Sequence, residues 1–228
     1  MQATESEAFL AFDKLLKTEV VDGQVNYPAF ANNAGFQSYI REIERTRADS
    51  FTDNSERIAY LINAYNALTI DSILQGRSPA SLLGRLRFFK TSKVRIGNED
   101  ISLYDLERDR ILTEGEPRVH FALVCASASC PPLRSEAYRA EKLDSQLDDQ
   151  ARGFINDSSK NSFDKSAKRA KVSKIFKWYR SDFEEGQSDL GDYLSQYVAD
   201  ADLARALRDD RFKFKYNAYD WSLNGTRR

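Results

Sequence analysis

The fold is decided by residues 57–70, which read RIAYLINAYNALTI. Apolar side chains point in almost every direction around this stretch, a pattern typical of a helix that is buried on all sides. Asp53 is suited to be its N-cap, and Glu56 follows at the capping-box spacing. Gly76 and Pro79 supply the stop signals beyond it. We therefore predict that this helix lies at the centre of the fold.

The flanking segments predict further helices before the central helix and strands after it. Helical spacing of apolar residues covers residues 5–19 and 29–47, and a Gly97-Asn98 turn predicts a hairpin of residues 93–96 and 100–103. The remaining predicted elements are helices at 104–112, 143–155, 190–198 and 203–207, and strands at 119–124 and 212–216. We expect a single α+β domain over residues 1–228, with a helical N-terminal half packed on a small, mostly antiparallel sheet.

Composition excludes several classes of protein. With 41% hydrophobic residues the chain is too apolar to be disordered, and with a net charge of −1 it has no global attraction for nucleic acid. The basic, aromatic stretch at 165–180 is followed at once by acidic residues, so we interpret it as a solvated face and expect no nucleic-acid partner. The chain contains no run of about 18 apolar residues, so we predict no membrane span. The oligomeric state is left open.

The chemistry of the chain is concentrated in residues 119–132, which read VHFALVCASASCPP. His120 is the only histidine, and both cysteines, Cys125 and Cys130, lie within this stretch. Histidine is the side chain that titrates near neutral pH without perturbation, so a proton shuttle would run through this stretch. On a strand, His120 and Cys125 would point to opposite faces, whereas a loop could fold Cys130 back towards the imidazole.

Two other interpretations of these residues stay open. Cys125 and Cys130 could form a disulfide around a short loop, with His120 buried beside it and no catalysis. They could also form a redox-active dithiol, although redox motifs usually have a two-residue spacing. Zinc would have three ligands and no recognisable fourth, so we predict no metal site.

A catalytic histidine needs a group that orients its ring, and we consider Asp220, Asn63 and Asn66 first. Asn63 and Asn66 are three residues apart on the central helix, so they share a face. Because a buried amide without partners costs about 1–3 kcal/mol, both need partners. Bracing of a neighbouring loop is the favoured explanation. Glu56 is already explained by its capping position.

Several motifs together resemble the DUF547 family over about residues 50–224. These motifs are LINAYNALTI at 61–70, HFALVCAS at 120–127 with CPPL at 130–133, LDDQA at 147–151, KIFKWY at 174–179 and YDWSLN at 219–224. DUF547 is a family of unknown function that is similar to the papain-like and transglutaminase-like cysteine hydrolases. Those enzymes have a cysteine at the start of the buried helix, a position that holds no cysteine here.

The resemblance and the residues lead to one leading hypothesis, a thiol-dependent hydrolase or acyl transferase acting on an amide or peptide-like substrate. Cys130 is the expected nucleophile, His120 the base, and Asp220 or Asn66 the orienting group. The expected supporting residues are Cys125, Asn63, Glu56, Tyr65 and Trp221.

The alternative is a non-catalytic, extracytoplasmic binding or scaffold module with a Cys125–Cys130 disulfide. No glycine-rich phosphate loop is present, so we expect no cofactor. The ligand class is a small or peptide-like molecule. The exported relatives implied by the resemblance suggest a periplasmic or secreted protein whose signal peptide is removed, while a cytoplasmic location stays open.

Overall fold

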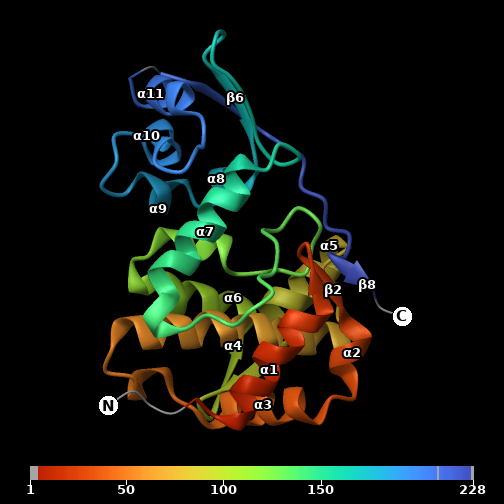
Figure 1. The fold of residues 1–228 in the computed structure, drawn as a ribbon. Helices are drawn as coiled ribbons and strands as arrows, with labels where there is room; N and C mark the ends of the chain where they lie inside the picture. The colour runs from red at the N-terminus through yellow and green to blue at the C-terminus, as the bar shows by residue number, and fades with distance from the viewer. Residues whose placement is uncertain (1–4, 210, 227–228) are drawn as a thin grey trace.

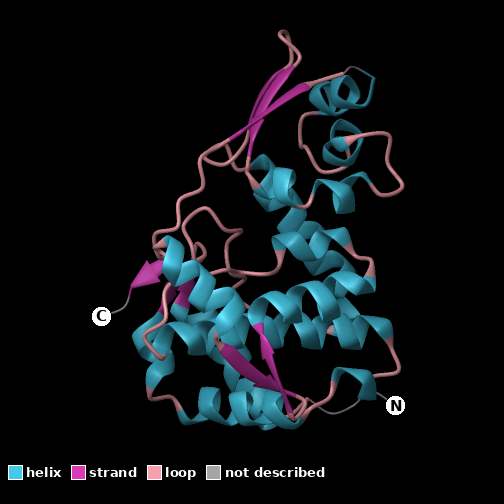
Figure 2. Ribbon diagram, turned by 180° about the vertical axis from the view of Figure 1, so that it is seen from behind, coloured by secondary structure: helices cyan, strands magenta, loops and turns pink. Residues whose placement is uncertain are grey.

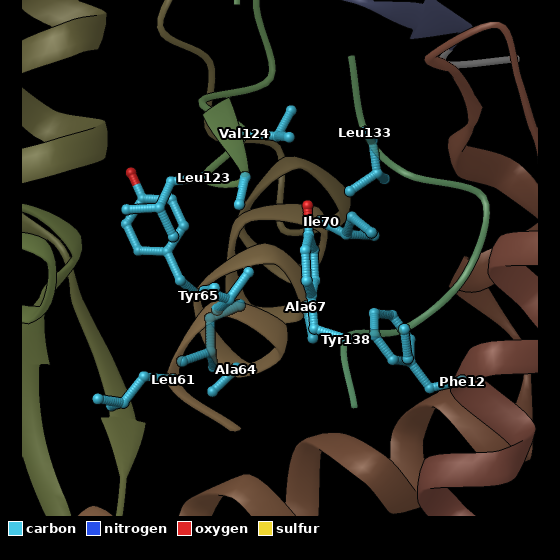
Figure 3. Packing of buried hydrophobic residues seen from close by; sticks show 14 of the residues in the cluster. Phe12, Leu61, Ala64, Tyr65, Ala67, Ile70, Leu123, Val124, Leu133 and Tyr138 are labelled. Atoms are coloured by element: carbon cyan, nitrogen blue, oxygen red, sulfur yellow. The ribbon is translucent and has the colours of Figure 1, made fainter. Parts of the chain in front are cut away.

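The computed structural model describes residues 5–209 and 211–226. Its centre is α4 (Asn54–Leu74), the helix predicted from the sequence (Figure 1). The Asp53 side chain accepts a hydrogen bond from the Glu56 backbone N–H, so the predicted N-cap is confirmed. Apolar side chains of α4 and its neighbours pack together around it, with Leu123 and Val124 on one side and Phe12 on another (Figure 3).

Three N-terminal helices cover one flank of α4. They are α1 (Glu7–Glu19), α2 (Tyr27–Ala31) and α3 (Ala34–Arg45), and Phe12 of α1 stacks on Tyr39 of α3 at a centroid distance of 4.7 Å. The helix predicted at 29–47 is therefore two helices. The break occurs because the Asn33 side chain accepts a hydrogen bond from the Phe36 N–H and caps α3 anew.

The predicted hairpin is present as β3 (Lys93–Ile96) and β4 (Glu99–Ser102). Gly97 and Asn98 have φ values of 57° and 69°, the left-handed conformation that a tight hairpin turn of this type requires. Between α4 and the hairpin lie α5 (Leu82–Arg85) and a π-helical turn, Leu86–Thr91. After it come α6 (Leu103–Leu106) and a second π-helical turn, Glu107–Ile111.

The strand predicted at residues 119–124 is wrong. Pro117–Phe121 is a 3₁₀ helix that begins with proline, and an irregular segment follows it. The backbone groups of this segment find partners outside any sheet: the Asn66 side chain donates to the Ala122 carbonyl and accepts from the Val124 N–H. A side chain from α4 thus takes the place of a neighbouring strand, which hydrophobicity alone does not reveal.

The C-terminal part builds a second apolar cluster. Its helices are α7 (Leu143–Asn156), α8 (Ile175–Trp178), α9 (Arg180–Glu184), α10 (Leu190–Ser195) and α11 (Ala201–Asp209). Val119 and Ala122 belong to the cluster around α4, whereas Phe121 belongs to the C-terminal cluster. The side chains of the residues around His120 therefore pack into both cores.

The described residues form three small sheets instead of the one that was predicted (Figure 2). The hairpin is one. The second joins β1 (Val20–Val21), β2 (Gln24–Asn26) and β8 (Gly225–Thr226), and the third joins β5 (Ser162–Asp164), β6 (Arg169–Val172) and β7 (Lys213–Tyr216). Only the β2–β8 and β6–β7 pairs are parallel. The α+β class and the mostly antiparallel pairing are confirmed, and no helix in the described part of the chain is long and apolar enough to cross a bilayer.

The third sheet predicts a measurable electrostatic cost. Arg169 lies opposite Lys213 and Lys171 lies opposite Lys215, all four exposed. Like charges that face each other across strands destabilise a sheet. We expect Lys215→Glu to raise the free energy of unfolding by about 0.5 kcal/mol in urea titrations at low salt. The gain should shrink in high salt, because exposed charges are screened.

Lys215→Gln is the matched control for this substitution, since it removes the repulsion without adding an attraction and should give a smaller gain. An unchanged or lower stability of Lys215→Glu at low salt would contradict the argument.

Candidate active site

The residues that carry the expected chemistry line one cavity. His120, Cys125 and Cys130 form part of the wall of a pocket of about 380 Å³, together with Tyr65 and Trp221. A volume of this size is typical of small-molecule sites. The other predicted site residues lie outside its lining: Asn63, Asn66, Glu56 and Asp220.

A larger, polar cavity of about 670 Å³ shares Cys130 and Pro131 with this pocket. Its lining includes neither His120 nor Cys125. The histidine and both thiols therefore meet only in the smaller of these two cavities, which is the candidate active site.

His120 is held by Asp182 of α9. Its Nε2 lies 2.8 Å from Asp182 Oδ2, and the imidazole side chain is only 2% exposed. The ring stacks on Tyr179 at 3.9 Å and meets the edge of Phe183 at 5.2 Å. The hydrogen bond from His120 lowers the pKa of the Asp182 carboxyl, so this group stays ionised beside the ring. Asp182 is thus the orienting group for His120.

Sequence reasoning missed Asp182 and favoured Asp220 for this role. Asp220 is exposed, and its Oδ1 accepts a hydrogen bond from the Ser222 N–H at 2.8 Å. Its backbone N–H donates to Ser129 Oγ, and its carbonyl accepts from the Ser129 N–H. Asp220 therefore holds the loop between the two cysteines and does not contact the imidazole.

Asn63 and Asn66 brace loops, as the favoured prediction had it. The Asn63 amide donates to the Tyr138 carbonyl at 2.8 Å and accepts from the Tyr138 N–H at 2.9 Å. Asn66 makes the same pair of bonds with Ala122 and Val124. Both amides are thereby occupied by backbone, so Asn66 does not orient His120. Glu56 lines a different cavity, beside α1 and α3.

The Cys125 thiol is surrounded by hydroxyl groups. Its Sγ lies 3.0 Å from Ser127 Oγ and 3.2 Å from the Tyr219 hydroxyl, and both cysteines are free. Burial alone would raise the pKa of the Cys125 thiol, but hydrogen bonds with Cys130, Ser127 and Tyr219 hold it below the ordinary cysteine value. A lowered pKa increases the fraction of thiolate, which is the nucleophilic form of cysteine.

Cys130 has the opposite character. Its side chain is buried, and its Sγ accepts a hydrogen bond from the Cys125 backbone N–H at 2.9 Å. Burial, together with the hydrogen bond to Cys125, raises the pKa of the Cys130 thiol. Among the described residues, neither sulfur forms a hydrogen bond with the His120 ring; the three groups share the pocket wall instead.

The backbone after Cys125 is strained, and hydrogen bonds from the C-terminal segment hold it in place. Ala126 is buried and has a φ of 58°, a left-handed conformation that costs a non-glycine residue energy. The Ala128 N–H donates to the Ser222 carbonyl at 2.7 Å, and the Asn224 N–H donates to the Ala126 carbonyl at 3.3 Å. Residues 220–224 thus hold the loop in the shape that exposes Cys125 to the pocket.

Glu107 is a further group that sequence reasoning missed. It lines the pocket and accepts hydrogen bonds from the hydroxyls of Tyr65 and Tyr179. Burial raises the pKa of its carboxyl more than these hydrogen bonds and the charge of His120 lower it. No sequence signal marks Glu107, because it lies among other charged residues of a segment that reads as an ordinary helix.

Part of this site lies in a segment that resembles a known family. Residues 49–155 match the model of a family described as "Protein of unknown function, DUF547". Residues 49–155 are therefore similar to DUF547 domains. This segment carries His120, both cysteines and Glu107, whereas Asp182 and Tyr219 lie C-terminal to the DUF547 match. Searches of curated proteins and of solved structures found no match, so the papain-like relation stays an expectation.

The environment of Cys125 predicts how this thiol reacts. Alkylation with iodoacetamide at graded pH should label Cys125 first, with an inflection below the ordinary cysteine value of about 8.5. Tyr219→Phe removes one hydrogen-bond donor to the sulfur and should move the inflection to higher pH, as followed by mass spectrometry. Tyr216→Phe, outside the pocket lining, is the control and should leave it unchanged. Preferential labelling of Cys130 would contradict this assignment.

The two asparagines give a second prediction with a built-in control. Asn66→Ala and Asn63→Ala each leave backbone groups unpaired and should each lower the free energy of unfolding by about 2 kcal/mol. Only Asn66→Ala should also slow the alkylation of Cys125, because only Asn66 holds the segment that leads into it. Urea titration and labelling rates measure the two effects. Equal labelling rates in both variants would show that the Asn66 brace does not position the thiol.

Proposed function

We propose that this domain is a thiol-dependent hydrolase or acyl transferase acting on an amide or peptide-like substrate, with Cys125 as the nucleophile. The sequence pointed to Cys130 for this role. Cys125 is the better supported of the two, because it is partly exposed and the pKa of its thiol is lowered. Cys130 is 5% exposed and the pKa of its thiol is raised, which suits a protonated neighbour of the nucleophile.

One observation carries the proposal. The Cys125 thiol, which is hydrogen-bonded with the hydroxyls of Ser127 and Tyr219, lines the same pocket as His120. The imidazole of His120 is in turn hydrogen-bonded to the ionised Asp182. Nucleophile, proton carrier and orienting carboxylate are the parts that acyl transfer through a thioester requires. The tyrosine hydroxyl stays protonated, since burial raises the pKa of Tyr219 far above its usual range.

The proposed reaction has two halves. In the first, the Cys125 thiolate attacks the carbonyl carbon and a C–S bond forms; the C–N bond then breaks, and the leaving nitrogen takes a proton from protonated His120. In the second, neutral His120 accepts a proton from water or from an acceptor amine. The resulting oxygen or nitrogen nucleophile attacks the thioester, and the C–S bond breaks to restore the thiolate. Because His120 Nε2 is hydrogen-bonded to Asp182, Nδ1 is the ring nitrogen that exchanges the proton with the leaving group and with water or the amine.

Hydrolysis of p-nitrophenyl acetate, with mass spectrometry of the acylated protein, tests this function. Cys125→Ala should abolish both turnover and acylation, while Cys130→Ala should retain part of each. His120→Asn should lower kcat by about a hundredfold or more, since general acid–base catalysis contributes about 10²–10⁴-fold.

Two aspartate variants separate the proposed orienting group from the one that the sequence favoured. Asp182→Asn should lower kcat and change the pH profile, whereas Asp220→Asn should retain most of the activity. Loss of activity in Cys130→Ala but not in Cys125→Ala would return the nucleophile to Cys130. No turnover and no acylation of the wild-type protein would favour the non-catalytic binding module.

A further inference from the structure

The rim of the active-site pocket is exposed and apolar. Among the described residues, seven large hydrophobic side chains are exposed, and four of them line this one pocket: Leu82, Leu86, Tyr104 and Trp178. Leu82 is 74% exposed and Leu86 is 50% exposed. Exposed apolar side chains that gather at one cavity mark a binding surface, whereas scattered ones need no explanation.

The geometry of the rim follows from the sequence of α5 and the π-helical turn after it. Leu82 and Leu86 are four residues apart, so they lie on the same face of the helical segment and both reach the pocket. Leu83 is even more exposed, at 78%, but does not line the pocket. The segment therefore has two leucines that line the pocket and, between them in the sequence, a more exposed leucine that does not line it.

Two cations from the same segment stand at this rim. The Arg85 guanidinium lies over the Trp221 ring at 4.7 Å, and the Lys90 ammonium lies over the Tyr104 ring at 4.3 Å. In the described part of the chain neither forms an ion pair with a carboxylate, while Arg85 Nη1 donates to the Pro79 carbonyl at 3.4 Å. The one carboxyl in the lining is Glu107, and it already accepts hydrogen bonds from the hydroxyls of Tyr65 and Tyr179. The pocket therefore has an apolar wall and, at its rim, two positive charges that would attract an anion.

We propose that this pocket binds a single-chain amphiphilic anion. Its hydrocarbon chain lies against Leu82, Leu86 and Trp178, and its carboxylate or phosphate is bound by Arg85 and Lys90. The inference deepens the proposed function, on which it rests for the reaction: an acyl compound of this kind, with its scissile carbonyl at Cys125, is the substrate class.

The chain supplies its own reporter for this binding. It contains two tryptophans, Trp178 and Trp221, and both line the pocket. Intrinsic tryptophan fluorescence therefore reports on this site. Titration of Cys125→Ala with dodecanoate, at monomeric concentrations, should give a saturable change in fluorescence. Dodecylamine, with the same chain and the opposite charge, and acetate, with the same carboxylate and no chain, should each bind at least tenfold more weakly.

Variants on the rim separate binding inside the pocket from adsorption to a surface. Leu82→Asp combined with Leu86→Asp should weaken dodecanoate binding at least tenfold, while the matched Leu83→Asp should leave the affinity unchanged. Arg85→Gln should reduce the preference for dodecanoate over dodecylamine. If a fluorescence change requires anionic phospholipid vesicles and depends equally on Leu83, the rim is a membrane-docking surface and the inference is overturned.

The two proposals fail in different ways. Saturable dodecanoate binding without hydrolysis of any acyl ester by the wild-type protein would keep the binding site and remove the enzymatic function. Ester hydrolysis that depends on Cys125, with no dodecanoate binding, would keep the enzyme and remove the amphiphile as its substrate class.

Discussion

The Asn66 carboxamide is the interaction on which the site depends. From the buried face of α4 it bonds the Ala122 carbonyl and the Val124 N–H, one residue on each side of Leu123. Unpaired backbone groups in an apolar core would be costly, so these two bonds allow an irregular segment to run through the interior. Because this segment is not part of a β-sheet, the chain can turn at Val124, and Cys125 then lies in the pocket wall.

The site lies where two apolar cores meet. Val119 and Ala122 pack with the helices around α4, and Phe121 packs with the C-terminal helices, so His120 lies at the boundary between them. The thiols come from the α4 side, and Asp182 comes from α9 on the other. The pocket is lined from both cores: Tyr65 and Cys130 belong to the cluster around α4, and Ile175 belongs to the C-terminal cluster.

The sequence predicted local structure well and long-range pairing poorly. The N-cap at Asp53, the central helix and the Gly97-Asn98 hairpin follow from contacts between residues close in the chain, and all three are confirmed. His120 and the two cysteines, which are close together in the sequence, also line one pocket. The strand at 119–124 failed because its apolar run satisfies its backbone through Asn66, 56 residues away from Ala122.

The partners of the reactive groups were missed for the same reason. Asp182 is 62 residues from His120, and it follows directly on the basic stretch at 165–180 that we interpreted as a solvated face. Tyr219 is 94 residues from Cys125, and no spacing rule connects them. A single sequence identifies the reactive groups. The contacts between these groups depend on how the two cores pack against each other.

The return of the C-terminal segment has a consequence for synthesis of the protein. Residues 219–224 supply a hydroxyl to Cys125 and the backbone partners of the loop after it, and β8 then pairs with β2, a strand from the first part of the sequence (Figure 1). A chain growing from its N-terminus can bury α1 to α4 long before these residues leave the ribosome. The surroundings of the Cys125 thiol are therefore completed late, because its Tyr219 partner is among the last residues to be synthesised.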